Sequence, residues 1–420
     1  MEIIELIYKV AGIVGMLFGL CYFYQIVYIF LPFFKKFFPK KAHKPEVIHT
    51  IGVLIAARNE EQVLPHLLDT INKQDYPAEN IRVYVVADNC TDNTAQAARE
   101  KGAMVVERFN KRQVGKGYAL NYLLGRLDSL GELDQCDAFL VLDADNLLTP
   151  SYIRAMNQTY CDGYEILCGY RNSKNFNQSW ISSGYGLWYM HDSVHLNQSR
   201  MMLNSSCAVS GTGFMFSRLV YREMAGWNFF TLTEDIEFNM YSVLHGRKIG
   251  YCPDAMLYDE QPVTFRQSWR QRIRWSQGGW QVSGKYGLRM IGSIFRKGPG
   301  RYARFEMATF TMWWCSISTV LLSISIVLGI ILNGLHHLIP LAVTGVLGSY
   351  GSFWIMGALV TLTEWKKIPG SPARKFWNTL TYPIYMLTWI PISFCSLFSK
   401  FEWKPIEHTV AVSLQDLPNK

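Results

Sequence analysis

The stretch Ile51-Gly-Val-Leu-Ile-Ala-Ala57 is followed at once by the polar residues Arg58-Asn59-Glu60. A continuous run of uncharged, mostly apolar residues is typical of a strand buried on both faces, as in a parallel sheet covered by helices. In an open parallel sheet, ligands bind at the carboxyl ends of the strands. Residues 58–60 are therefore the first place where we expect a binding site.

The segments after this strand alternate between helix-like and strand-like patterns. Val63, Leu67, Leu68 and Ile71 recur at helical spacing directly behind it. In chain order, we expect a helix at 60–73, a strand at 83–87, a helix at 93–101, a strand at 104–106, a helix at 117–127 and a strand at 138–142. This alternation predicts an α/β fold with a doubly wound sheet.

Two further strand ends carry acidic residues. Asp88 follows the strand at 83–87, and Asp143-Ala-Asp145 follows the strand at 138–142. Asp143 and Asp145 are two apart on an extended segment, so their side chains share one face. Two carboxylates would repel a diphosphate unless a hard divalent cation lay between them, so the pair predicts a metal site; a solvated turn is the alternative. Asp88 is expected to accept hydrogen bonds from the base or ribose of a nucleotide, or else to cap a helix.

Two segments outside these motifs are candidate ligand contacts. Lys116, at the start of a predicted helix, is placed to reach phosphates, with a solvated helix start as the alternative. Gly211-Thr212-Gly213-Phe214 follows a run of small residues. Glycines let the backbone approach a ligand closely, so this segment is expected to border an acceptor sugar; a plain turn or β-bulge is the alternative.

Glu234 and Asp235 stand at a predicted helix start, where an acid is commonly a cap. The other interpretation is that Asp235 takes the proton from an acceptor hydroxyl, in a single displacement that inverts the sugar carbon. Gln271, Arg274 and Trp275 lie at i, i+3 and i+4 and so share one helical face. Arg274 offers a fork of donors for a diphosphate, and Trp275 offers a flat apolar face for a sugar ring. A helix that only lies in a membrane interface is the alternative.

Long apolar runs flank these motifs. Of the 420 residues, 49% are hydrophobic and 13 are Trp. The runs occupy residues 7–34, 306–333, 338–363 and 376–399. Each has the length of about 20 residues that a helix needs to cross a bilayer. The sequence therefore predicts a multi-pass membrane protein with a globular head.

Charge predicts the orientation of this protein in the membrane. Glu2 and Glu5 precede the first run, and Lys35, Lys36, Lys40, Lys41 and Lys44 follow it. We therefore expect an uncleaved anchor in the plasma membrane, with the N-terminus outside and the head in the cytoplasm. The net charge of +8 lies largely beside the runs, where anionic lipid accounts for it, so no nucleic-acid partner is expected. Prolines interrupt the last run, so whether it crosses and on which side the chain ends stay open.

Five motifs together carry a family resemblance. In order they are Ala57-Arg-Asn-Glu60, Asp88, Asp143-Ala-Asp145, Thr233-Glu-Asp235 and Gln271-Arg-Ile-Arg274-Trp275. They resemble those of the membrane-integrated family 2 glycosyltransferases, the group of the cellulose, chitin and hyaluronan synthases. The resemblance covers most of residues 50–285 and implies a Rossmann-like GT-A fold, a UDP-sugar donor and Mg²⁺ or Mn²⁺.

The resemblance also implies a role for each motif. Asp235, with Glu234 beside it, would be catalytic, and Asp143 and Asp145 would hold the metal. The residues implied in nucleotide-sugar binding are Ala57, Arg58, Asn59, Glu60, Asp88, Lys116, Asp143, Gln271 and Arg274. Those implied at the acceptor are Gly211, Thr212, Gly213, Phe214 and Trp275. Glu260 also resembles a family position.

The sequence thus predicts four regions: an anchor at 1–44, a GT-A domain at 45–262, amphipathic interface helices at 263–300 and a membrane region with a tail at 301–420. We predict an inverting, processive glycosyltransferase that makes a β-linked polysaccharide from a UDP-sugar and feeds the growing glycan through the bilayer. Four spans are few for a channel, so three alternatives stay open: a homo-oligomer, a partner subunit or short products. Transfer of one sugar to a polyprenyl-phosphate or lipid acceptor is the alternative, and a non-catalytic assembly subunit is a weaker one.

Overall fold

The computed structural model describes residues 2–38, 42–298, 300–334, 336, 338–399 and 412–417. Lys40, Lys41 and the tail residues 400–411 and 418–420 lie outside the described residues. The strands are β1 (Ile51–Ala57), β2 (Ile81–Asp88), β3 (Met104–Arg108), β4 (Ala138–Asp143), β5 (Leu147–Leu148), β6 (Ile166–Ser173), β7 (Phe214–Ser217) and β8 (Ile249–Asp259).

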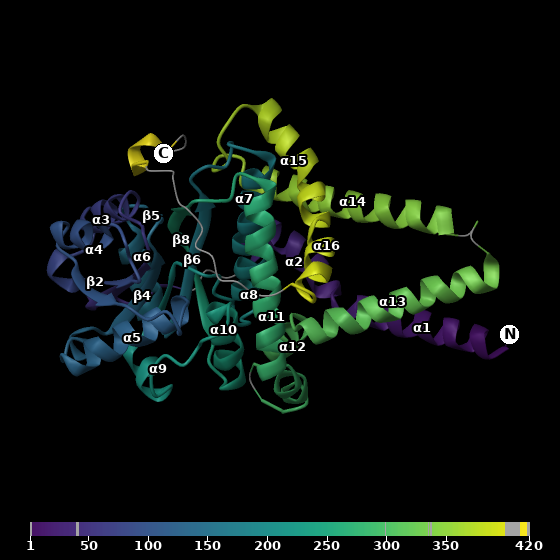
Figure 1. The fold of residues 1–420 in the computed structure, drawn as a ribbon, viewed down its shortest axis with the longest axis horizontal. Helices are drawn as coiled ribbons and strands as arrows, with labels where there is room; N and C mark the ends of the chain where they lie inside the picture. Colours follow the sequence, from purple (N-terminus) through teal and green to yellow (C-terminus); the bar gives the residue numbers. More distant parts are fainter. Residues whose placement is uncertain are drawn as a thin grey trace.

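Helices surround these strands and extend beyond them (Figure 1). Those before β7 are α1 (Glu2–Cys21), α2 (Phe23–Phe30), α3 (Leu64–Asn72), α4 (Thr94–Glu100), α5 (Lys116–Ser129), α6 (Tyr152–Cys161), α7 (Trp180–His191), the π-helical turn η4 (Asp192–Asn197) and α8 (Gln198–Met202). Those after β7 are α9 (Arg218–Glu223), α10 (Glu234–Leu244), α11 (Phe265–Ser293), α12 (Arg301–Thr309), α13 (Met312–Asn333), α14 (Leu338–Thr363), α15 (Pro372–Leu387) and α16 (Trp389–Ser396).

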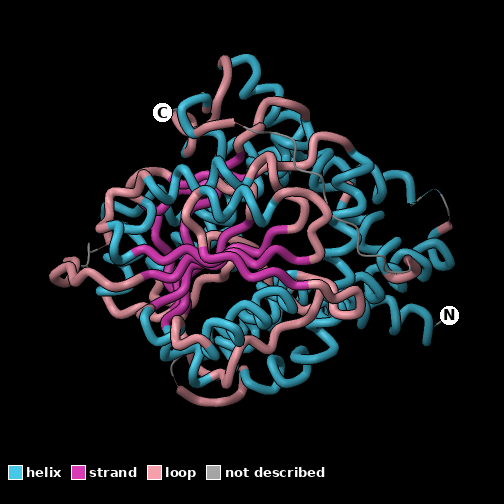
Figure 2. Tube along the Cα trace, turned by 60° about the vertical axis from the view of Figure 1, so that its left-hand side comes forward, coloured by secondary structure: helices cyan, strands magenta, loops and turns pink. Residues whose placement is uncertain are grey.

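The strands form one mixed sheet in the order β3-β2-β1-β4-β7-β6-β8-β5. The half built from β1 to β4 is parallel, as predicted. The other half is not: β7 pairs antiparallel with both β4 and β6. Figure 2 shows the strands in the middle of the head with helices on both sides. The prediction of a Rossmann-like α/β fold is confirmed, and the antiparallel strand was not anticipated.

Alternate residues of β1 enter different cores. Leu54 belongs to the cluster that contains Leu120 of α5, whereas Ile55 belongs to the cluster that contains Leu67 of α3. Both faces of the strand are therefore covered by helices, which explains why β1 is apolar throughout rather than at every second position.

Helix α3 begins later than predicted, at Leu64 rather than near residue 60. Pro65 lies in its first turn, where the missing N–H costs nothing and the fixed backbone angle favours helix initiation. As a consequence, Arg58, Asn59 and Glu60 stay in a loop at the carboxyl end of β1.

The apolar runs differ in how they fold. Among the described residues, two helical stretches have the length and composition of a membrane span, Glu2–Phe37 and Ala342–Thr363. The run at 306–333 is divided between α12 and α13, and the run at 376–399 between α15 and α16. In Figure 1, α1, α13 and α14 extend together away from the sheet.

The segment 412–417 returns to the head. Leu417 is buried in one cluster with Leu147 of β5 and Tyr258 of β8. The last described part of the chain therefore lies against the edge of the sheet formed by β5 and β8.

Candidate active site

A cavity of about 590 Å³ opens at the carboxyl ends of the strands, under α11. Most of the residues expected at a site line it: Ala57, Arg58, Glu60, Asp88, Lys116, Asp143, Asp145, Gly211, Glu234, Asp235, Glu260, Gln271, Arg274 and Trp275. They come from segments up to 218 residues apart in the chain, from Ala57 to Trp275. The fold therefore gathers the predicted motifs into one volume.

The strand register explains part of this gathering. Ala57 pairs with Ala87, and Ala56 pairs with Asp143, so β1, β2 and β4 end side by side. Because parallel strands end at the same edge of a sheet, Asp88 and Asp143 project beside the Arg58–Glu60 loop.

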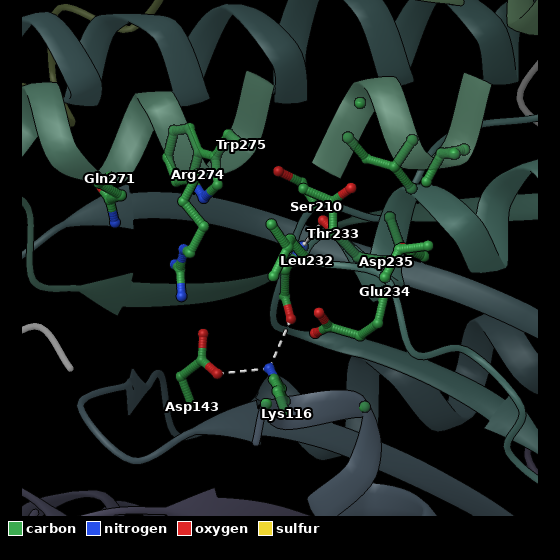
Figure 3. Close-up of a pocket in the computed structure, with 18 of the residues that line it drawn as sticks. Lys116, Asp143, Ser210, Leu232, Thr233, Glu234, Asp235, Gln271, Arg274 and Trp275 are labelled. Carbon is green, nitrogen blue, oxygen red and sulfur yellow. Dashed lines mark hydrogen bonds and ion pairs between the residues drawn. The ribbon is translucent and has the colours of Figure 1, made fainter. Parts of the chain in front are cut away.

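Lys116 links three parts of the cavity. Its ammonium lies 2.5 Å from Asp143 Oδ1 and donates to the carbonyl of Gly211 at 2.8 Å (Figure 3). Burial disfavours the charged ammonium, but the carboxylates of Asp143, Glu234 and Asp235 outweigh that effect and raise the pKa of Lys116. The side chain is therefore a stable cation on the cavity wall, as phosphate binding requires.

The two acids of the predicted metal pair both line the cavity. The side chain of Asp143 is about a third exposed, whereas Asp145 is buried and its Oδ2 accepts the backbone N–H of Glu260 at 2.7 Å. Among the described residues, no group of three His, Cys, Asp or Glu side chains could hold a metal by itself. Mg²⁺ is commonly held by one or two carboxylates while substrate phosphates and water complete its shell. The pair fits such a shared site and not an all-protein one.

Glu234 and Asp235 open α10, with Glu234 turned toward Lys116 (Figure 3). Asp235 Oδ2 accepts the N–H of Gly211 at 2.7 Å. Burial, together with the like charge of Asp235, raises the pKa of Glu234 to about 7, and burial also raises the pKa of Asp235 above its ordinary value. A carboxylate with a raised pKa binds a proton more readily than an ordinary one, which suits Asp235 to act as a general base.

Asp88 lines the cavity and has an ion-pair partner that was not predicted. Its Oδ1 lies 2.5 Å from Nη1 of Arg108, and both side chains are almost fully buried. Arg108, at the end of β3, also donates to the carbonyl of Gln113. Asp88 therefore positions the loop after β3 in addition to lining the cavity, and nothing in the sequence around Arg108 pointed to this partner.

Only the first residue of the predicted acceptor segment, residues 211–214, reaches the cavity. Gly211 lines the cavity, but Thr212, Gly213 and Phe214 do not. The hydroxyl of Thr212 donates a hydrogen bond to Asn146 Oδ1. Phe214, in β7, is fully buried in the hydrophobic core, where its ring packs against Trp227. A Cβ on Gly213 would lie 2.1 Å from Leu257, so this glycine serves close packing.

Asn59 also stays off the cavity wall: its φ is +58°, and its Oδ1 accepts the N–H of Thr91.

Helix α11 brings its three predicted residues to the cavity on one face, as the spacing required. Arg274 extends from the helix toward Asp143 (Figure 3). Trp275 packs among aromatic rings, with ring centroids 5.8 Å from Trp188 and 6.4 Å from Trp389. The segment 263–300 therefore contains one long helix at its centre, where several interface helices were expected.

Several cavity residues were not predicted. Arg171 and Asp259 form a buried ion pair between β6 and β8, and the Arg171 guanidinium lies 3.7 Å from the ring centroid of Tyr189. Burial raises the pKa of Asp259 to about 6, although Arg171 opposes the effect. Asp259 ends a strand, which was an available signal. Arg171 lies in a strand with no motif around it, so no local pattern could have identified it.

Residues 49–278 match the family described as "Glycosyltransferase like family 2". Over 401 residues the chain is 23% identical to the probable glycosyltransferase YdaM of Bacillus subtilis, covering 90% of this chain and 89% of that protein. It is 27% identical to the beta-monoglucosyldiacylglycerol synthase of Synechocystis sp., covering 55% of this chain and 48% of that protein. It is 24% identical to the poly-beta-1,6-N-acetyl-D-glucosamine synthase of Staphylococcus epidermidis, covering 61% of each. The chain thus spans less than two thirds of the length of the latter two relatives.

A solved structure shares the fold. The mannosyltransferase PcManGT from Pyrobaculum calidifontis, in complex with GDP-Man and Mn²⁺, matches with a TM-score of 0.56 at 18% identity. The match covers 92% of this chain and 98% of that one. It therefore extends over the head and most of the helices that flank it.

Proposed function

This chain belongs to the glycosyltransferase-like family 2, and we propose that it is an inverting, processive enzyme that polymerises the sugar of a UDP-sugar into a β-linked polysaccharide at a membrane. One observation carries the proposal. A single cavity joins the acids Asp143 and Asp145, the carboxyl of Asp235 and the Arg274–Trp275 face of α11. Donor, base and acceptor groups for one transfer would thus share one volume.

The donor would bind at the ends of the parallel strands. Arg58, Glu60 and Asp88 line that end of the cavity, and Lys116 and Arg274 supply cations toward Asp143. Asp143 and Asp145 would hold Mg²⁺ or Mn²⁺, which when bound neutralises charge on the leaving diphosphate. Arg274 offers a planar fork of donors suited to phosphate oxygens.

Transfer would be one displacement at the anomeric carbon. The acceptor hydroxyl oxygen forms the new bond, the bond to the diphosphate oxygen breaks on the opposite face, and the hydroxyl proton passes to Asp235. The N–H of Gly211 holds Asp235 Oδ2 in place at 2.7 Å. One displacement inverts the sugar carbon, so an α-linked donor would give a β-linked product.

Trp275 would carry the acceptor sugar. Its ring lines the cavity and is supported by Tyr185, Trp188 and Trp389. A supported aromatic ring offers the flat apolar face on which a sugar ring stacks. Such a platform suits an acceptor that is itself a sugar, which supports polymerisation over one transfer to a polyprenyl phosphate.

A membrane location is supported by the helices that leave the head. Large apolar side chains remain exposed along α1, α13 and α14: Leu6, Leu17, Val327, Ile331, Val346 and Leu347. Exposed apolar surface on this scale marks contact with lipid or with another protein. We propose that these helices cross the plasma membrane, with the head cytoplasmic and the N-terminus outside, and that more than one copy or a partner subunit completes any channel.

A glycolipid acceptor is the second candidate. The cavity continues past Asp235 to Met307, Phe310 and Met312, at the base of α12 and α13. An apolar wall at this place favours an acceptor with a lipid tail. A relative of the chain is named as a glucosyldiacylglycerol synthase and another as a poly-N-acetylglucosamine synthase, so both kinds of acceptor occur among similar proteins.

A donor screen tests the proposal. Protein in nanodiscs is given each nucleotide sugar with Mn²⁺ or Mg²⁺, nucleotide release is followed, and labelled product is sized. UDP release from one donor with a long, water-soluble product supports the polymerase. Label that extracts with lipid as a single-sugar product supports the glycolipid enzyme. No release from any donor refutes both.

A further inference from the structure

Gly211 is the point where two parts of the proposed site meet. Its N–H donates to Asp235 Oδ2 at 2.7 Å, and its carbonyl accepts from Lys116 Nζ at 2.8 Å. Lys116 in turn pairs with Asp143. The orientation of this residue therefore governs both the proposed base and the cation beside the proposed metal acid. Its φ of +73° is a conformation that glycine adopts without strain.

Arg171 holds the residue before this glycine. Its Nη1 donates to the carbonyl of Ser210 at 2.9 Å, and its Nε donates to Asp259 Oδ2 at 2.7 Å. The guanidinium also lies 3.7 Å from the ring centroid of Tyr189. A planar group held by two hydrogen bonds and a ring face has one orientation, which a flexible ammonium would lack.

The guanidinium and the proposed base flank the same glycine. A Cβ on Gly211 would lie 3.6 Å from Arg171 Nη1 and 4.0 Å from Asp235 Oδ2. We propose that Arg171 is a positioning residue for the proposed transfer, on which this inference rests: it anchors Ser210 so that Gly211 presents its N–H to Asp235 and its carbonyl to Lys116. Asp259 and Tyr189 fix the guanidinium from β8 and α7.

The competing explanation is that Arg171 only neutralises Asp259. The Asp259 side chain is 3% exposed, so its charge needs a partner whether or not Ser210 is held. The two roles separate when both charges are removed. A neutral pair no longer needs a counter-ion, but Ser210 still loses its anchor.

The test compares three variants: Asp259→Asn, Arg171→Met and the double variant. The single change Arg171→Met leaves a buried carboxylate unpaired and is expected to fold poorly, so the double variant carries the result. We expect it to fold, to bind UDP as Asp259→Asn does, and to have a kcat about 100-fold below that of Asp259→Asn, because small displacements of catalytic groups cost about that much. The KM for the donor should change by less than about 3-fold, since kcat alone depends on an interaction made in the transition state.

Two further variants sharpen the result. Arg171→Lys keeps one donor to Ser210 and should recover part of the lost kcat, whereas Met should not. Arg247→Met is the matched control, because Arg247 bridges Glu165 and Glu223 outside the cavity and its side chain is similarly buried. Its kcat should equal that of the wild type. A double variant with the kcat of Asp259→Asn overturns the inference and leaves Arg171 as a counter-ion only. A wild-type protein without transfer overturns the proposed function instead.

Discussion

Replacing Asp235 by Asn tests the proposed chemistry most directly. The amide keeps the size of the side chain and one oxygen that can still accept the Gly211 N–H, which now lies 2.7 Å from Oδ2. What it removes is the ability to take a proton. General-base catalysis contributes about 100- to 10,000-fold in rate, which corresponds to about 2.7–5.4 kcal/mol in the barrier. We therefore expect kcat to fall by that factor while the donor KM changes by less than about 3-fold.

The electrostatics of the site add a second signature. A carboxyl with a raised pKa is deprotonated only above that pKa, so a base of this kind loses activity as the pH falls. Burial raises the pKa of Asp235, so wild-type kcat should begin to decline at a higher pH than an ordinary aspartate base would give; the pKa of the neighbouring Glu234 is raised to about 7. The folded state binds these protons more tightly than the unfolded chain, so the pair destabilises the protein increasingly as the pH rises toward 7. Removing one charge should therefore not lower the melting temperature at pH 8.

The assay is nucleotide release and product formation at saturating donor, from pH 5.5 to 9, with UDP binding and thermal unfolding as controls. Glu234→Gln is the matched variant, since it removes the neighbouring carboxyl and leaves the one that Gly211 holds. The reasoning is refuted if Asp235→Asn keeps more than about a tenth of wild-type kcat. It is refuted equally if Glu234→Gln loses more kcat than Asp235→Asn, which would make Glu234 the base.

Three other predictions follow from the structure. Trp275→Ala should shorten or abolish the product with little change in UDP binding, because the ring that supports the acceptor is lost. Trp275→Phe should retain part of the product length. Product sizing by gel measures this, and an unchanged length would leave Trp275 with a packing role only. Chelation of divalent metal by EDTA should abolish transfer, and Asp145→Asn should raise the Mn²⁺ concentration needed for half-maximal activity. Metal titration checks both expectations. Full activity in EDTA would remove the metal from the proposal. Arg200→Met should destabilise the fold by about 3–5 kcal/mol because it leaves Glu306 buried without a cation. Adding Glu306→Leu should recover most of that loss in a denaturant titration, and no recovery would show that the pair is not the source of the stability.

Several features of this protein follow from local sequence. The burial of β1 on both faces appears as an unbroken apolar run, and polar residues mark where β1, β2 and β4 end. Because parallel strands end at one edge, their terminal residues had to be neighbours once the sheet formed. Gln271, Arg274 and Trp275 likewise had to share a face, since helical spacing alone determines it.

The antiparallel strand β7 follows from no such local rule. β7 lies between β4 and β6, although it follows both in the chain. The position of this strand decides that Gly211 reaches the cavity while Phe214 enters the core. In an extended chain a shift of one residue reverses the face of every side chain, and the glycine-rich pattern carries no information on that register.

Pairing between distant residues is the other contribution of the tertiary structure. Arg171 meets Asp259 across 88 positions of sequence, and Asp88 meets Arg108 at the ends of neighbouring strands. A lone arginine in a strand has no periodicity and no fixed partner, so its sequence neighbours cannot reveal the carboxylate that will neutralise it. The sequence by itself determined which chemical groups are available and at which strand ends they lie. Only the order and register of the strands decided which of these groups are in contact. A buried charge needs a partner of opposite charge, and the completed sheet determines which one lies within reach.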